Sequence, residues 1–382
     1  MHVLRQPEYR FIALGGGNDI GGSCYALKFG DSVIMLDAGI KFKTDLAERT
    51  PDVTPLFAVW GLDGLWELDA LIISHAHLDH AGALPAFFRN LHGVSIYSST
   101  ATPDMLTALY RDNFSSSRNR DIAAISDTFI TPAYGVPFKV KGLTLTLYPA
   151  GHMPGAAMTL IEDERCKVLY TGDFCTFGQL TVKAAEIPRV KVNTLICEST
   201  HGYGDFPGAL SLAHTAEMIN ALRRDTDIFT CKVMNTGRAA EIAAAVCECV
   251  RLGLIAEMDI FIDAGCLESC RACEKWGEYQ IFGEHVRPFE GYTFGRDSMI
   301  ITNRASAWPY EFTPIMTNHA DTFGILELIA RVKPDKVILV HGFPFPTKNG
   351  THNIPLEIRE RFGESVEVVH SVNGRTINLL KE

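Results

Sequence analysis

The residues most able to do chemistry are gathered in one short run, His75-Ala76-His77-Leu78-Asp79-His80. It places three imidazoles and one carboxylate within six residues. Neutral imidazole and carboxylate oxygen are the ligands that zinc takes in catalytic sites, where one position stays open for water. A structural zinc site is more often rich in cysteine and fully coordinated. The run therefore predicts a catalytic metal centre that hydrolyses its substrate, rather than a set of unrelated surface histidines.

The elements around this run explain how it is presented. Residues 71–73 form a short apolar segment that predicts a buried strand ending at the motif, and residues 81–91 predict a helix after it. Alternate residues of an extended segment point to the same side, so we expect His75 and His77 to share one side. Asp79 and His80 follow on the turn and are expected to face a neighbouring position.

Other strand ends must contribute if two metals are bound, because about six ligands are then needed. His152 lies in a glycine-framed turn, Asp173 follows an apolar segment at 168–170, and His341 ends the segment 336–340 before Gly342. A lone residue of this kind is usually structural, but the repeated pattern of apolar strand, ligand and glycine favours function. Asp37 has the same context, and we expect it to accept a hydrogen bond from a metal-bound histidine.

The wider pattern is that of an α/β protein with an insertion. Short strands are predicted at residues 11–14, 23–29, 32–36 and 194–197. After residue 201, helices at 210–224 and 236–254 alternate with strands at 227–230 and 259–262, which is typical of a parallel α/β unit. A helix at 321–332 and a strand at 336–340 then return to the pattern of the first part of the chain. We therefore expect a first domain segment at 1–200, an inserted domain at 201–310 and a return segment at 311–382.

Composition narrows the class of partner. The net charge of −10 argues against broad attraction to nucleic acid, so such a substrate would need a local groove and the charge of the metals. No segment has the roughly 18 to 20 uncharged apolar residues of a spanning helix. Residues 1–10 lack the apolar core of a secretory signal, so no membrane partner and a cytoplasmic location are expected.

Three weaker signals are set aside. Cys266, Cys270 and Cys273 have the spacing of a radical-SAM iron–sulfur motif, but they lie deep in the inserted unit and are expected to be helical cysteines without a ligand role. The glycines at 15–17 and 21–22 do not match a nucleotide-binding loop and predict a tight turn between strands. His201 lies near the expected cleft, with its role open.

Together these residues resemble the metallo-β-lactamase fold and, within it, the β-CASP nucleases, a family that includes ribonuclease J and the endonuclease of pre-mRNA 3′-end processing. The resemblance covers nearly the whole chain. The family's four metal motifs match the segments around Asp37, the run from His75 to His80, His152 and Asp173. Its later motifs match Glu198 (motif A), His319 (motif B), His341 (motif C) and the segment Gly237-Arg238-Ala239-Ala240-Glu241.

The resemblance implies an αββα sandwich with a short inserted β-CASP-like domain, and two Zn²⁺ per chain, with Mn²⁺ as the alternative. It assigns His75, His77 and His152 to one metal, Asp79, His80 and His341 to the other, and Asp173 with a hydroxide to the bridge. That hydroxide would attack phosphorus, with Asp79 and Asp173 among the catalytic residues. His319, oriented by Glu198, would protonate the leaving oxygen.

Histidine at motif C favours single-stranded RNA as the substrate. The alternatives are a DNA nuclease of the same fold and a non-catalytic scaffold subunit of a nucleic-acid processing or defence complex. A homo-oligomer or protein partners are not readable from the sequence. Departures from the family pattern concern the substrate: Asn318 replaces a glycine, Phe343 replaces an acidic residue, and Phe174-Cys175-Thr176 lacks an arginine. Residues 201–310 also hold ten Lys and Arg against fifteen Asp and Glu, so the expected insertion is not basic.

Overall fold

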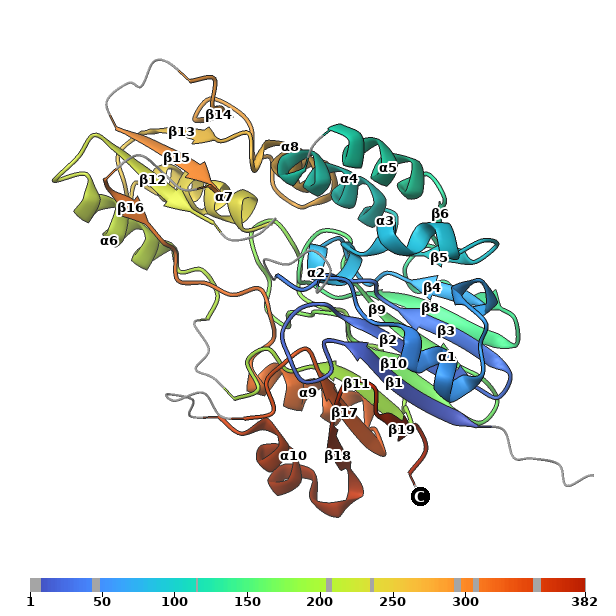
Figure 1. Cartoon of the computed structure of the whole chain (residues 1–382). Coiled ribbons are helices and arrows are strands. Elements are labelled where there is room, and N and C mark those ends of the chain that lie inside the picture. The colour runs from blue at the N-terminus through green and yellow to red at the C-terminus, as the bar shows by residue number, and fades with distance from the viewer. Residues whose placement is uncertain are drawn as a thin grey trace, which may run out of the picture.

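Three β-sheets organise the chain. The structure, a computed structural model, describes residues 8–42, 49–114, 116–203, 208–233, 237–291, 297–304, 309–345 and 352–381. Two seven-stranded sheets face each other, and a five-stranded sheet lies apart from them (Figure 1). The two facing sheets hold the strand ends at which the candidate residues were expected.

The first sheet has the order β19-β1-β2-β3-β4-β5-β6. Its strands are β1 (Tyr9–Gly15), β2 (Cys24–Phe29), β3 (Ser32–Leu36), β4 (Ala70–Ile72), β5 (Ser95–Tyr97), β6 (Phe129–Ile130) and β19 (Thr376–Asn378). The second has the order β18-β17-β11-β10-β9-β8-β7. Its strands are β7 (Phe138–Val140), β8 (Leu143–Pro149), β9 (Ala157–Glu162), β10 (Lys167–Tyr170), β11 (Thr194–Glu198), β17 (Lys336–Val340) and β18 (Glu367–His370).

The near-continuous apolar strands follow from burial on both faces. In β1, Phe11 and Ala13 belong to the core between the two sheets, whereas Ile12 and Leu14 belong to the core beneath the helices. Helices α1 (Thr54–Trp60), α2 (Leu78–Ala81), α3 (Leu84–Phe87), α4 (Thr102–Asn113) and α5 (Ser116–Ser126) lie beside the first sheet. Helices α9 (Thr322–Val332) and α10 (Ile354–Phe362) lie beside β17 and β18 (Figure 1). The predicted αββα sandwich is confirmed.

The third sheet is entirely parallel, in the order β14-β13-β15-β12-β16. It consists of β12 (Ile228–Lys232), β13 (Asp259–Ile262), β14 (Val286–Pro288), β15 (Ser298–Thr302) and β16 (Glu311–Phe312), with α6 (Leu212–Leu222), α7 (Arg238–Arg251) and α8 (Leu267–Trp276). This is the parallel α/β unit that the alternating pattern predicted. Its last strand lies just beyond the boundary expected at residue 310.

The final segment completes both sheets of the sandwich. Strands β17 and β18 extend the parallel ladder that begins at β10 and β11, and β19 pairs antiparallel with β1. The five-stranded sheet is therefore inserted within the sandwich in sequence, and it is also joined to it by side chains. Asp112 of α4 accepts hydrogen bonds from the backbone N–H groups of Glu268 (2.9 Å) and Ser269 (2.8 Å) in the first turn of α8.

Local structure differs from expectation after the metal motif. The helix predicted at residues 81–91 is divided into α2, α3 and a 3₁₀ turn at Phe88–Asn90. Gly82 is the C-cap of α2, and Pro85 stands in the first turn of α3, where its missing N–H costs nothing. Among the described helices, none has the length and apolarity needed to cross a membrane.

Candidate active site

The carboxyl ends of six strands bring the candidate residues together. Strands β3 and β4 run parallel to each other, as do β10, β11 and β17, so their ends meet at the same edges. Asp37 follows β3, and the segment from His75 to His80 follows β4. The other positions are His152 after β8, Asp173 after β10, Glu198 as the last residue of β11, and His341 after β17. His319 lies shortly before α9. Every residue assigned to the site from the sequence is buried here except Asp79, which is partly buried.

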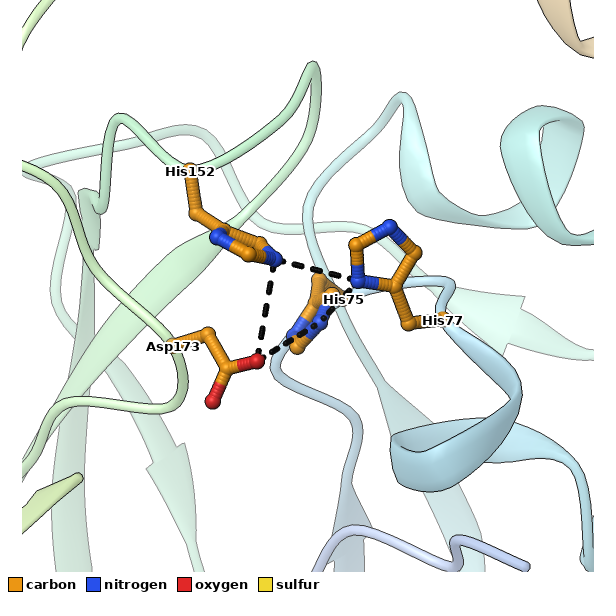
Figure 2. Close-up of side chains that lie close together, drawn as sticks. All are labelled: His75, His77, His152 and Asp173. Atoms are coloured by element: carbon orange, nitrogen blue, oxygen red, sulfur yellow. Dashed lines mark hydrogen bonds and ion pairs between the residues drawn. The ribbon is translucent and has the colours of Figure 1, made fainter. Parts of the chain in front are cut away.

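Three imidazoles and one carboxylate form the first candidate metal group. The side chains of His75, His77, His152 and Asp173 point toward one another (Figure 2). His77 Nδ1 lies 3.1 Å from His75 Nε2 and 3.0 Å from His152 Nε2. Asp173 Oδ2 lies 3.6 Å from both of those Nε2 atoms. Ligands of a tetrahedral zinc ion at bond lengths of about 2.0 to 2.1 Å lie roughly 3.3 Å apart, so these separations suit a zinc ion.

Asp79, His80 and His341 form the second group. Asp79 Oδ2 lies 3.4 Å from His341 Nε2, and His80 Nε2 lies 3.3 Å from Asp173 Oδ2. The other oxygen of Asp173, Oδ1, lies 3.5 Å from His341 Nδ1. Asp173 therefore reaches both groups, which is the position that the resemblance assigned to a bridging ligand.

Two observations test whether a metal fits these groups. Asp173 Oδ1 is buried and has no hydrogen-bond partner among the described residues, an arrangement that is costly unless a cation satisfies it. The second nitrogens of the histidines are also held, as is usual for metal ligands. His152 Nδ1 hydrogen-bonds the Asn318 carbonyl oxygen (2.8 Å), and His80 Nδ1 contacts Asp37 Oδ2 (2.7 Å). The donor set and its outer contacts both suit zinc.

The electrostatics keep three of these ligands, His75, His152 and Asp173, in the metal-binding form. Burial, followed by the charges of neighbouring histidines, lowers the pKa of His75 and of His152 well below the usual value. Their imidazoles are therefore neutral and offer a lone pair. Burial alone would raise the pKa of Asp173, but the charges of His341, His80 and His319 hold it well below its ordinary value, so the bridging carboxylate is ionised.

Asp37 is the centre of a buried hydrogen-bond network beneath the second group. Besides its contact with His80, its carboxylate accepts from the backbone N–H (2.7 Å) and hydroxyl (2.7 Å) of Ser74 and from the hydroxyl of Tyr170 (2.6 Å). Its φ of 60° is a strained conformation for a non-glycine residue. The sequence pointed to Asp37, but it missed Ser74 and Tyr170, which have no distinctive spacing.

The glycine-rich segment between β1 and β2 supports the metal motif. Ser23, directly after it, donates its backbone N–H to the Asp79 carbonyl oxygen (2.8 Å), and its hydroxyl lies 3.4 Å from His80 Nε2. Gly39 passes so close to the Asp79 carbonyl that any Cβ there would collide with it. The predicted turn thus belongs to the scaffold of the site.

A third group carries acid–base chemistry. His319 Nδ1 lies 3.0 and 3.1 Å from the two carboxylate oxygens of Glu198, and 3.9 Å from Asp173 Oδ2. The backbone N–H of Phe174 donates to Glu198 Oε1 (2.9 Å) and fixes that carboxylate. Burial alone would lower the pKa of His319, but the negative charges of Glu198 and then Asp173 raise it above the usual value. The pair therefore favours a protonated imidazole beside the metal groups.

Thr200 and His201, which follow Glu198 in the sequence, also contact residues of the site. The Thr200 hydroxyl hydrogen-bonds His341 Nδ1 (3.0 Å), and His341 has a φ of 50°. His201 Nε2 hydrogen-bonds the Thr317 hydroxyl (2.8 Å). Burial, followed by the charge of His319, lowers the pKa of His201 to about 4, so this imidazole is neutral. The proximity of Thr200 to motif A was the only signal for its role in the sequence.

The cysteines take no part in these groups. All ten are free thiols, and the candidate metal groups among the described residues contain none of them. Burial raises the pKa of Cys270 well above its usual value and that of Cys266 and Cys273 to about 12, which leaves the thiols protonated. Cys270 and Cys273 lie in α8 as expected, and Cys266 is its N-cap residue; the absence of a ligand role stays a prediction.

Comparison with known families gives two matches. Residues 17–182 match the metallo-beta-lactamase superfamily, and residues 314–344 match a Zn-dependent metallo-hydrolase RNA specificity domain. The first match contains the whole first metal group, and the second contains His319 and His341.

Curated relatives and a solved structure agree with these matches. The endoribonuclease YSH1 of Yarrowia lipolytica is 35% identical over 51% of this chain and 24% of its own length. The transcription termination factor FttA of Pyrococcus horikoshii is 30% identical over 75% of this chain and 48% of its own. The chain thus spans less than half the length of either relative. A crystal structure of a protein of unknown function from Enterococcus faecalis shares the fold, with a TM-score of 0.61, 14% identity and coverage of 97% of this chain and 100% of that one.

Proposed function

Since the chain belongs to the metallo-β-lactamase superfamily, we propose that it is a zinc-dependent phosphodiesterase that cleaves single-stranded RNA. The observation that carries this proposal is the Glu198–His319 pair, which places a protonated imidazole 3.9 Å from Asp173 of the metal groups. Simple hydrolysis of a good leaving group has little need of such an acid, whereas the alkoxide released from a phosphodiester does. The relatives named as an endoribonuclease and a termination factor support the same reading.

Two zinc ions per chain would be held by the two groups, with Mn²⁺ as the alternative. His75, His77 and His152 would hold one ion, and Asp79, His80 and His341 the other, with Asp173 shared. When bound, the pair would supply activated water and positive charge near the phosphoryl oxygens.

The acid–base step belongs to the chain's own residues. Glu198 accepts a hydrogen bond at His319 Nδ1, which leaves the Nε2 proton of the imidazolium for the leaving 3′ oxygen. Phe174 also holds Glu198 through its backbone N–H, so the pair is oriented before substrate arrives. Asp37, through His80, orients a ligand of the second group without touching substrate.

A digestion experiment tests the proposal. End-labelled RNA and DNA of one sequence would be incubated with the full chain loaded with zinc or manganese, using 5′-phosphorylated and 5′-blocked strands. We expect cleavage of RNA that a chelator abolishes. Cleavage of DNA alone would contradict the proposed substrate, and a metal-loaded chain that cleaves neither strand would support the scaffold alternative instead.

Two further assignments accompany this function. We propose that residues 201–310, which hold β12 to β15 and helices α6, α7 and α8, form the inserted domain, and that 1–200 and 311–382 form the sandwich, with β16 at the start of 311–382 adding the edge strand of the third sheet. We also propose the cytoplasm as the compartment, because ten free thiols suit a reducing environment.

A further inference from the structure

The start of α7 carries a charged side chain that the mechanism above does not use. Arg238 is the first residue of this helix and is partly buried. Its Nε atom is buried and has no hydrogen-bond partner among the described residues. None of the described carboxylates forms an ion pair with it, although Glu241 lies one turn further along the same helix. The Nε–H of Arg238 thus lacks the acceptor that a buried polar group ordinarily has.

Glu241 does not pair with Arg238, because its carboxylate holds the start of the helix in place. Its carboxylate accepts from the backbone N–H groups of Leu180 (2.8 Å) and Thr181 (2.9 Å), and from the Thr181 hydroxyl. These residues belong to the loop that follows the bridging Asp173. Gly237, which precedes Arg238, lies close to Met153, the neighbour of the ligand His152: a Cβ at position 237 would lie 3.8 Å from Met153 Cβ. The start of α7 is therefore held by the loop that follows Asp173, and it lies close to the loop that carries His152.

The charge of Arg238 acts on the histidines of the acid–base group. After burial and the charge of His319, Arg238 is among the groups that lower the pKa of His201. It also opposes the rise that Glu198 and Asp173 cause in the pKa of His319. Burial lowers the pKa of Arg238 itself, yet a guanidinium stays protonated in proteins. A positive charge is thus maintained within electrostatic range of the imidazole that would protonate the leaving oxygen.

A partly desolvated cation with a buried, unpartnered N–H is costly unless a ligand supplies the acceptor. Carboxylate and phosphate both match the fork of arginine donors. The carboxylate of the acid–base group, that of Glu198, already contacts His319 and the backbone N–H of Phe174. None of the described residues therefore supplies this anion, which points to an anionic ligand that enters beside the acid–base group.

We propose that Arg238 binds a backbone phosphate of the substrate strand beside His319, and so sets the register of the strand in the site. This inference rests on the proposed function and deepens it. It also gives a chain with a net charge of −10 a local positive group for a polyanion, in addition to the charge of the metals, without a broad basic surface. Recognition of phosphate does not by itself distinguish RNA from DNA.

Binding without cleavage is the direct test. The full chain would be titrated into fluorescently labelled single-stranded RNA and DNA in the presence of a chelator, with anisotropy measured over a series of salt concentrations. We expect Arg238→Gln to weaken binding by about 10- to 100-fold, the range for a hydrogen bond to a charged group. The slope of log Kd against log salt concentration should fall by about 0.7, the value for one phosphate contact on a single strand.

Two other variants make the test specific. Arg251→Gln removes an exposed arginine at the far end of the same helix and should leave the affinity and the slope unchanged. Arg238→Lys keeps the charge but not the planar fork, so it should restore the slope while recovering only part of the affinity. If circular dichroism shows that Arg238→Gln does not fold, Arg238→Lys tests the role of the guanidinium in its place.

The outcomes separate this inference from the proposed function. If the wild type cleaves RNA and Arg238→Gln binds with unchanged affinity and slope, the inference is overturned and the function stands. If the wild type binds both strands with the expected dependence on Arg238 but cleaves neither, phosphate binding is supported and the nuclease proposal fails. Equal losses in Arg238→Gln and Arg251→Gln would overturn the specific role of Arg238.

Discussion

The metal groups and the acid–base group share Asp173 as a neighbour, yet they differ in what they present to the cleft. The first metal group lies within one matched family segment, and the pKa values of His75 and His152 are lowered so that both imidazoles are neutral. The acid–base side consists of Glu198, Arg238 and His319, which come from three separate segments. It presents an imidazole whose pKa is raised and a guanidinium whose Nε has no hydrogen-bond partner among the described residues. One side offers lone pairs to a cation, whereas the other offers protons and charge to an anion.

The largest expected loss of activity comes from removing a ligand of the first metal group. His77→Ala removes the imidazole whose Nδ1 lies within 3.1 Å of two other ligand nitrogens. We expect both zinc binding and hydrolysis to be abolished, because the remaining ligands cannot close the site. Metal content by elemental analysis and digestion of end-labelled RNA measure the two effects. His92→Ala, at an exposed histidine, is the matched control and should retain both.

The acid–base side should fail differently. We expect His319→Ala to lower the cleavage rate by about 10² to 10⁴, the usual contribution of a general acid, while the zinc content stays that of the wild type. Glu198→Gln should act in the same direction, because it removes the charge that raises the pKa of His319. Single-turnover rates and metal content provide the measurement. Equal zinc loss in His77→Ala and His319→Ala would refute the separation of the two sides.

This difference also explains what the sequence could predict. The run from His75 to His80 is local, and Asp173 and His341 each follow an apolar strand, so simple patterns placed them. Glu198 and His319 are far apart in the chain and were assigned only through the family resemblance. The roles of Ser74 and Tyr170 were missed, because a hydrogen bond to Asp37 depends on tertiary contact and leaves no periodic signal. The sequence singled out Arg238 only as part of a motif, and its unpaired state required the packing of α7.

The network beneath the metal side should have an intermediate effect. Asp37→Asn keeps the shape of the side chain but removes the charge that holds His80 Nδ1 at 2.7 Å. We expect zinc affinity to fall by about 10- to 100-fold, as is usual when an outer partner of a ligand is lost. Competition with a chromophoric chelator measures the affinity. Tyr170→Phe deletes one of the hydrogen bonds to Asp37 and should cause a smaller loss in the same direction, so an unchanged affinity in both variants would contradict the network's role.

The smallest effect concerns His201, a neutral imidazole beside the charged His319. Its pKa is lowered to about 4 in the folded chain, against about 6.5 when unfolded. Between these values the unfolded chain binds more protons, so this residue's contribution makes the folded state less stable as the pH falls from about 6.5 toward 4. Between about pH 7 and pH 5 the free energy of unfolding should fall in both proteins. We expect the fall to be about 1 to 2 kcal/mol smaller in His201→Asn than in the wild type. Urea unfolding of both proteins at the two pH values, in the presence of chelator, provides the measurement. An equal loss in both would mean that His201 is protonated alongside His319, and that the acid–base side tolerates two adjacent cations in addition to Arg238.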